Sequence, residues 1–165
     1  MNFVKLSNFI LPTLEKRLKH KKALSIFATE RAKFEGWLKV EMCDILLEKF
    51  DDVYPEKNWI DITFSDWAIE LKTANTNKRY DNAKNKNKPI TNNVKGVLKD
   101  IEKLTNQKIK NKAVLFIVFP IEHKNNKWQS HLKKISTNLQ KLIHKEFKFN
   151  NGLPGVIYFG LIKSN

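Results

Sequence analysis

The chain has 165 residues, with 31 Lys and Arg against 17 Asp and Glu, for a formal net charge of +14. This length suits one domain with its own core, and a single cysteine, Cys43, excludes an internal disulfide. No run of about 18 apolar residues exists to cross a membrane, and the first residues show no signal-peptide pattern, so we expect a cytoplasmic protein.

The positive charge favours a polyanionic partner such as DNA or RNA. Only three of the cations are Arg, the side chain that best reads guanine edges, so contacts with a phosphate backbone are favoured over base reading. Lys and Asn are also enriched where a genome is AT-rich, and the charge alone therefore does not establish a function.

Residues 3–49 are predicted to be mostly helical. Residues 3–20 predict a helix in two pieces, with Pro12 in the first turn of the second piece. Residues 1–23 are interpreted as an N-terminal helical extension, and residues 24–49 predict the strongest helix.

Two acidic residues lie on the apolar side of the helix predicted over residues 24–49. Its narrow apolar stripe includes Phe34, Leu38 and Ile45. Glu41 falls in the middle of the stripe and Glu35 on its border. A carboxylate there is costly unless it is paired or binds a cation, so both are candidates for a functional site.

A hairpin is predicted next, with strands at 58–64 and 67–73 after a weak strand within 51–57. Side chains alternate between the faces of a strand, so Glu70 and Lys72 share one face. If Ser65 and Asp66 form the turn, Asp61 lies directly opposite Glu70, where Cβ atoms are about 5 Å apart. Two carboxylates this close repel each other unless a divalent cation lies between them.

Residues 74–95 contain seven Asn, six Lys or Arg and one acidic residue. This composition predicts a segment too polar to pack, and we interpret residues 74–90 as a mobile basic loop that settles on a phosphate backbone. A disordered insertion without a role is the alternative. The candidate nucleic-acid-binding residues are Asn75, Asn77, Lys78, Arg79 and Tyr80.

The C-terminal half alternates helices and strands. Residues 91–105 predict a helix capped by Thr91, and residues 112–119 predict a buried strand. Residues 127–147 predict another helix and residues 153–162 a last strand.

The hairpin carries a resemblance to a known family. Asp61, followed after the turn by Glu70-Leu71-Lys72, resembles the signature of the PD-(D/E)XK, or restriction-endonuclease-like, nuclease superfamily, although Ile60 stands where the signature has proline. The predicted order of elements over residues 24–120 also resembles the αβββαβ core of that superfamily. The fold implied is α/β, with a mixed central sheet flanked by helices.

The resemblance also implies a metal-dependent endonuclease. Asp61, Glu70 and the carbonyl of Leu71 would hold Mg²⁺, for which Mn²⁺ can substitute. Lys72 would orient or deprotonate the attacking water, or stabilise charge at the phosphorus, and either Glu41 or Glu35 would complete the site. Phosphodiester hydrolysis in DNA, rather than RNA, is the expected activity, in restriction, repair or a mobile element.

Two alternatives stay open at this point. One is a basic nucleic-acid-binding domain that keeps the fold but does no chemistry. The other is a nuclease subunit that needs a partner, for which a homodimer is one form.

Overall fold

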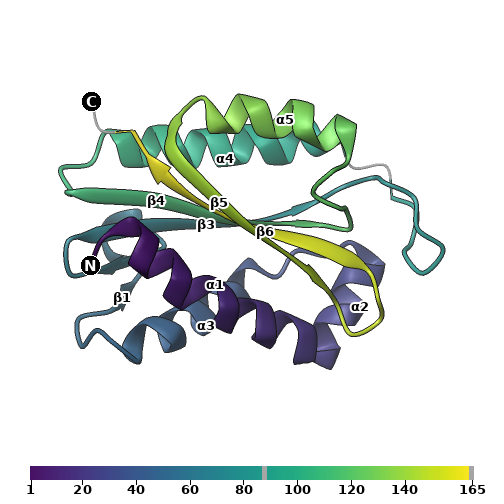
Figure 1. The fold of residues 1–165 in the computed structure, drawn as a ribbon, viewed down its shortest axis with the longest axis horizontal. Coiled ribbons are helices and arrows are strands. Elements are labelled where there is room, and N and C mark those ends of the chain that lie inside the picture. Colours follow the sequence, from purple (N-terminus) through teal and green to yellow (C-terminus); the bar gives the residue numbers. More distant parts are fainter. Residues whose placement is uncertain (87–88, 164–165) are drawn as a thin grey trace.

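The computed structural model describes residues 1–86 and 89–163. They form an α/β structure around a mixed six-stranded sheet of order β1-β2-β3-β4-β6-β5 (Figure 1). The strands are β1 (Tyr54–Pro55), β2 (Ile62–Phe64), β3 (Trp67–Asn75), β4 (Asn111–Phe119), β5 (Leu139–Lys148) and β6 (Pro154–Ile162).

Helices cover both faces of this sheet (Figure 1). One face carries α1 (Phe3–His20), α2 (Lys22–Glu30) and α3 (Glu35–Leu47), and the other carries α4 (Ile90–Thr105) and α5 (Asn126–Ser136). Each face has its own apolar cluster, because β3 and β4 send alternate side chains to opposite sides. Ile69 and Leu71 thus pack towards α1 and α3, while Ala68 and Ala74 pack towards α4.

The predicted break within the first helix is wrong. Helix α1 runs without interruption from Phe3 to His20, with Pro12 inside it and exposed. Leu6, Ile10, Leu14 and Leu18 recur every four residues and are fully buried, so packing of this stripe holds the helix through the proline.

The helix predicted over residues 24–49 is two helices. Helix α2 ends at Glu30, its C-cap residue Arg31 takes a left-handed conformation with φ of 52°, and α3 begins at Glu35. The Arg31 guanidinium is buried and donates to the carbonyls of Thr76, Lys78 and Lys84 at 2.5–2.6 Å. These contacts lie some 45 residues further along the chain, so the local helical pattern could not reveal the break.

Arg31 also organises the segment after β3, which was predicted to be too polar to pack. That prediction is wrong for Asn75, Thr76 and Ala83, which are buried, whereas residues 77–79 are exposed. The Asn75 amide donates to the carbonyl of Arg31 at 2.6 Å. Residues 87 and 88 of the loop predicted over 74–90 lie outside the described residues.

The predicted hairpin and the following crossover are observed. Strands β2 and β3 pair with Phe64 opposite Trp67, around the turn at Ser65 and Asp66. The first strand is shorter than predicted, because residues 57–59 form a 3-10 turn. Helix α4 then connects β3 to the parallel strand β4, and Pro89 rather than Thr91 occupies its N-cap position.

The helix predicted over residues 127–147 is wrong in its second half. Helix α5 ends at Ser136, and residues 139–148 form the edge strand β5, antiparallel to β6. Two glycines of β6 make room for side chains of β5: a Cβ at Gly155 would lie 2.5 Å from the Phe147 ring, and one at Gly160 would lie 2.6 Å from Leu139.

Candidate functional site

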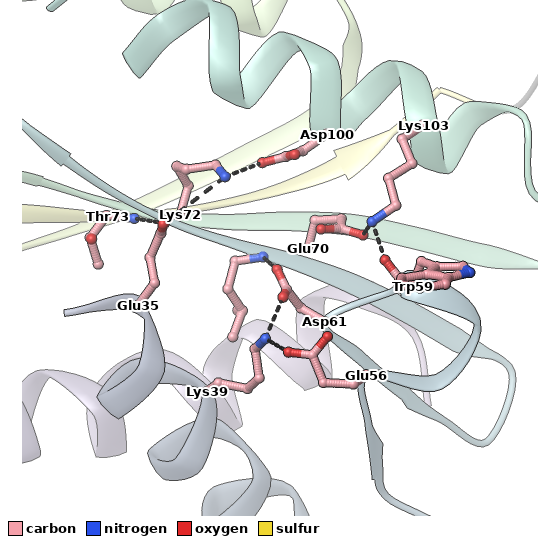
Figure 2. A network of polar contacts seen from close by, with 11 residues as sticks. Glu35, Lys39, Glu56, Trp59, Asp61, Glu70, Lys72, Thr73, Asp100 and Lys103 are labelled. Atoms are coloured by element: carbon pink, nitrogen blue, oxygen red, sulfur yellow. Dashed lines mark hydrogen bonds and ion pairs between the residues drawn. The ribbon is translucent and has the colours of Figure 1, made fainter. Parts of the chain in front are cut away.

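The candidate site is built on the part of β3 that extends beyond its neighbour β2. Strand β3 has nine residues and β2 has three, so the edge of β3 is unpaired by β2 after Ile69. Two carboxylates take over as acceptors there: Asp61 Oδ2 accepts from the Leu71 N–H at 2.8 Å, and Glu35 Oε2 accepts from the Thr73 N–H at 3.2 Å (Figure 2). Asp61 and Glu35 thus lie at the site because their carboxylates accept hydrogen bonds from the unpaired backbone N–H groups at the edge of β3.

The backbone of Leu71 supplies a further oxygen at this edge. Within a strand, the N–H and C=O of one residue point to the same side. Because the Leu71 N–H points to Asp61, the Leu71 carbonyl faces the same open edge. This is the geometry required if that carbonyl is to share a ligand with the Asp61 carboxylate.

Glu70 lies beside Asp61, as the hairpin register requires. Its side chain is 4% exposed, and its Oε1 accepts from Lys103 of α4 at 2.6 Å. Burial raises the pKa of Glu70 to about 7, with Lys103 acting against the shift and the Asp61 carboxylate adding to it. Glu70 is therefore about half protonated at neutral pH.

Asp61 behaves in the opposite way. Burial acts to raise its pKa, but the Lys39 ammonium, the Leu71 N–H and Glu70 hold the pKa below its usual value. Lys39 of α3 lies 2.7 Å from Asp61 Oδ1 and also contacts Glu56. The pKa values of the two neighbouring carboxyl groups are thus shifted in opposite directions, because the charge on one opposes ionisation of the other.

Lys72 lies on the α4 side of the sheet with Glu70. Its Nζ is 3.1 Å from Asp100 of α4 and 3.9 Å from Glu35 (Figure 2). Burial acts to lower the pKa of Lys72, but these carboxylates raise it above its usual value. Lys72 is therefore an ammonium at neutral pH, so it can stabilise negative charge but cannot accept a proton.

Glu35 and Glu41 were alternative predictions for the helix acid of the site, and they lie in different surroundings in the structure. Glu35, in the first turn of α3, touches Thr73 and Lys72. Glu41 instead pairs with Arg17 of α1 at 2.7 Å. Glu41 thus lies in an ion pair between α1 and α3, and the structure places Glu35 rather than Glu41 at the edge of β3.

Three residues of the site were not predicted, namely Lys39, Asp100 and Lys103. Asp100 did carry a signal, because it stands between Val97, Ile101 and Leu104 on the apolar face of α4. Lys39 and Lys103 carried none, since a lysine on a helix is ordinarily solvated. Lys39 pairs with Asp61 and Lys103 with Glu70, while Asp100 pairs with Lys72.

Trp59 lies beside the site at the protein surface and does not pack in the core. Its side chain is 87% exposed and its backbone has φ of 64°. Its carbonyl accepts from Lys103, the partner of Glu70. The exposed indole is thus attached to the site through its backbone.

The oxygen atoms at this site are of the kind that bind a hard cation taking few of its ligands from the protein. No group of three or more His, Cys, Asp or Glu side chains that could enclose a metal occurs among residues 1–86 and 89–163. Mg²⁺ does not need such a cage, since it commonly binds one or two carboxylates and keeps water and phosphate oxygens as its other ligands. Asp61, Glu70 and the Leu71 carbonyl fit this requirement.

The residues predicted to bind nucleic acid fall into two groups. Asn75 is 1% exposed and bonded to Arg31 and Asn93, so it has a structural role and that prediction is wrong. Asn77, Lys78 and Arg79 are exposed, and Tyr80 is half-buried against the apolar cluster of α1 and α3. Only the exposed side chains are available to a ligand.

No helix in the described part of the chain is long and apolar enough to span a membrane. The chain matches no family model, no curated protein and no solved structure with which it was compared.

Proposed function

We propose that the protein is a metal-dependent endonuclease that hydrolyses phosphodiester bonds in DNA on a restriction-endonuclease-like core. The main support is the open edge of β3, where Asp61 accepts from the Leu71 N–H beside the buried Glu70 carboxyl and the partly buried Lys72 ammonium. The order α3, β1, β2, β3, α4, β4 agrees with the αβββαβ core of the superfamily that the hairpin resembles.

In this proposal, Asp61, Glu70 and the Leu71 carbonyl hold Mg²⁺. A cation held there would supply a water of lowered pKa and would neutralise charge on the phosphate oxygens. Lys72, kept protonated by Asp100 and Glu35, stabilises the negative charge that develops around the phosphorus. Lys39 and Lys103 fix the two metal-binding carboxylates until the metal and the phosphate arrive.

Hydrolysis adds water to the phosphorus and releases one deoxyribose oxygen. The resemblance implies 5′-phosphate and 3′-hydroxyl products. Glu35 holds the edge of β3 through Thr73 and faces Lys72, so its role is to position that ammonium.

A second candidate is a nucleic-acid-binding domain without catalysis. It is favoured by the pairing of Asp61 with Lys39 and of Glu70 with Lys103, since each ammonium competes with a metal ion for its carboxylate. A homodimer or a partner subunit remains compatible with either function.

The experiment that separates the candidates is a cleavage assay. The purified protein is incubated at low salt with supercoiled plasmid, linear duplex, single-stranded DNA and RNA, in Mg²⁺, Mn²⁺ or EDTA. Lys72→Ala is run in parallel, with Lys5→Ala on the opposite face of the sheet as the matched control.

The nuclease proposal predicts cleavage that needs metal, survives in Lys5→Ala and falls at least about a hundredfold in Lys72→Ala. Binding without cleavage in every metal would replace it with the binding domain.

A further inference from the structure

A second candidate site lies away from the carboxylates, at the carboxyl ends of the parallel strands β3 and β4. A pocket of about 730 Å³ opens there between the chain that follows β3 and the first turns of α4 and α5. Its volume lies within the roughly 300–1,000 Å³ of small-ligand sites. Open α/β sheets bind ligands in the crevice outside the carboxyl ends of their strands.

The rim of this pocket is basic. Lys78 and Arg79 come from the chain after β3, and Lys127 comes from the first turn of α5; all three are exposed. No Asp or Glu occurs among the described residues that line the pocket. Helices α4 and α5 both start at the pocket without an acidic residue in their first turns, so their dipoles add to the positive potential.

The inner wall of the pocket is apolar. Ile90 stands at the start of α4, and Ile121 and Trp128 are 5% and 2% exposed. The Trp128 indole is fixed, because its N–H donates to the Tyr158 hydroxyl at 2.6 Å. A rigid apolar wall below a cationic rim suits a ligand with a flat apolar body and an attached anion.

We propose that this pocket binds one nucleotide unit, with the base against Ile90, Ile121 and Trp128 and the phosphate against Lys78, Arg79 and Lys127. A free mononucleotide and a nucleotide of a bound strand share this chemistry.

The proposal that the nucleotide belongs to a bound DNA strand rests on the proposed nuclease function. The distance between the pocket and Lys72 fits this proposal. Thr76 in the pocket wall lies four residues beyond Lys72 on β3, and Thr91 lies nine residues before Asp100 on α4. Both spacings correspond to about 13 Å along the same face of the sheet. A DNA strand whose phosphate lies at Lys72 can therefore place a nearby nucleotide in the pocket.

The test measures binding in EDTA by calorimetry, so that cleavage plays no part. The probes are adenosine 5′-monophosphate, adenosine, inorganic phosphate and a 5′-phosphorylated tetranucleotide. The variant is Lys127→Glu, and the matched control is Lys133→Glu, an exposed residue later in α5. A glutamate in the first turn of a helix favours the helix, so Lys127→Glu is expected to fold.

We expect the mononucleotide to bind with a Kd below about 1 mM, at least tenfold tighter than adenosine or phosphate. Lys127→Glu should weaken it at least tenfold and Lys133→Glu should not. If the tetranucleotide binds more tightly than adenosine 5′-monophosphate, the natural ligand is a nucleotide within a DNA strand. If the two bind equally, the natural ligand is a free nucleotide.

Three results would overturn the proposal: no binding of either nucleotide probe, equal binding of phosphate, or equal weakening by both substitutions. A protein that cleaves DNA but fails this test retains only the nuclease function. A protein that binds the mononucleotide as expected but never cleaves DNA supports the nucleotide pocket and contradicts the nuclease function.

Discussion

The charge of Glu70 depends strongly on its surroundings. Its pKa rises from 4.5 in the unfolded chain to about 7 in the folded protein, because the side chain is buried beside Asp61. Its favourable contribution to stability is therefore full below pH 4.5 and is lost as pH rises through 7. Asp61, whose pKa is lowered, loses its own contribution only in more acidic solution.

Glu70→Gln should remove this dependence, since glutamine stays neutral. Without divalent metal, we expect the variant to gain stability relative to the wild type between pH 5 and 8, by about 1–3 kcal/mol. Denaturant unfolding of both proteins across this range gives the difference in the free energy of unfolding. A difference independent of pH would mean that Glu70 titrates as an ordinary glutamate.

At the scale of elements, Arg31 connects the end of α2 to the chain beyond β3. Arg31→Met leaves the carbonyls of Thr76, Lys78 and Lys84 without their buried donor. We expect a loss of about 2–4 kcal/mol and faster proteolysis within residues 77–86. Arg79→Met is the matched control, because Arg79 is exposed, and it should change stability by less than about 0.5 kcal/mol. Equal effects of the two substitutions would contradict this role of Arg31.

The same contacts explain which elements were predictable from sequence. The β2–β3 hairpin was predicted with its register, because alternation and a two-residue turn are local. The α2–α3 break was missed because it depends on carbonyls about 45 residues away. Strand β5 was missed because Leu139, Leu142 and Ile143 also fit a helical spacing. What selects the strand is pairing with β6, whose glycines leave room for the side chains of Leu139 and Phe147.

The candidate site was predictable to a similar extent. Asp61, Glu70 and Lys72 belong to one hairpin, so their proximity follows from strand geometry. Glu35 could be chosen over Glu41 only after α3 was placed with its first turn at the edge of β3. Asp100 and Lys103 come from the crossover helix, whose rotation about its own axis depends on packing that local patterns do not specify.

At the scale of the whole molecule, the net charge of +14 predicts how binding depends on salt. Contacts with about four phosphates release their counterions, so affinity for duplex DNA should fall about a hundredfold between 50 and 200 mM salt. Fluorescence anisotropy in EDTA measures this slope. An affinity that does not change with salt would exclude the phosphate backbone as the main contact.

The central claim is that Asp61 makes the carboxylate pair a metal site for phosphodiester hydrolysis. The most direct measurement is the Mg²⁺-dependent rate of plasmid cleavage by the wild type, Asp61→Asn and Asp44→Asn, in which the control carboxylate pairs with Arg17 outside the site. We predict that Asp61→Asn abolishes cleavage and retains DNA binding, while Asp44→Asn cleaves like the wild type. Undiminished cleavage by Asp61→Asn would contradict the assignment of this site.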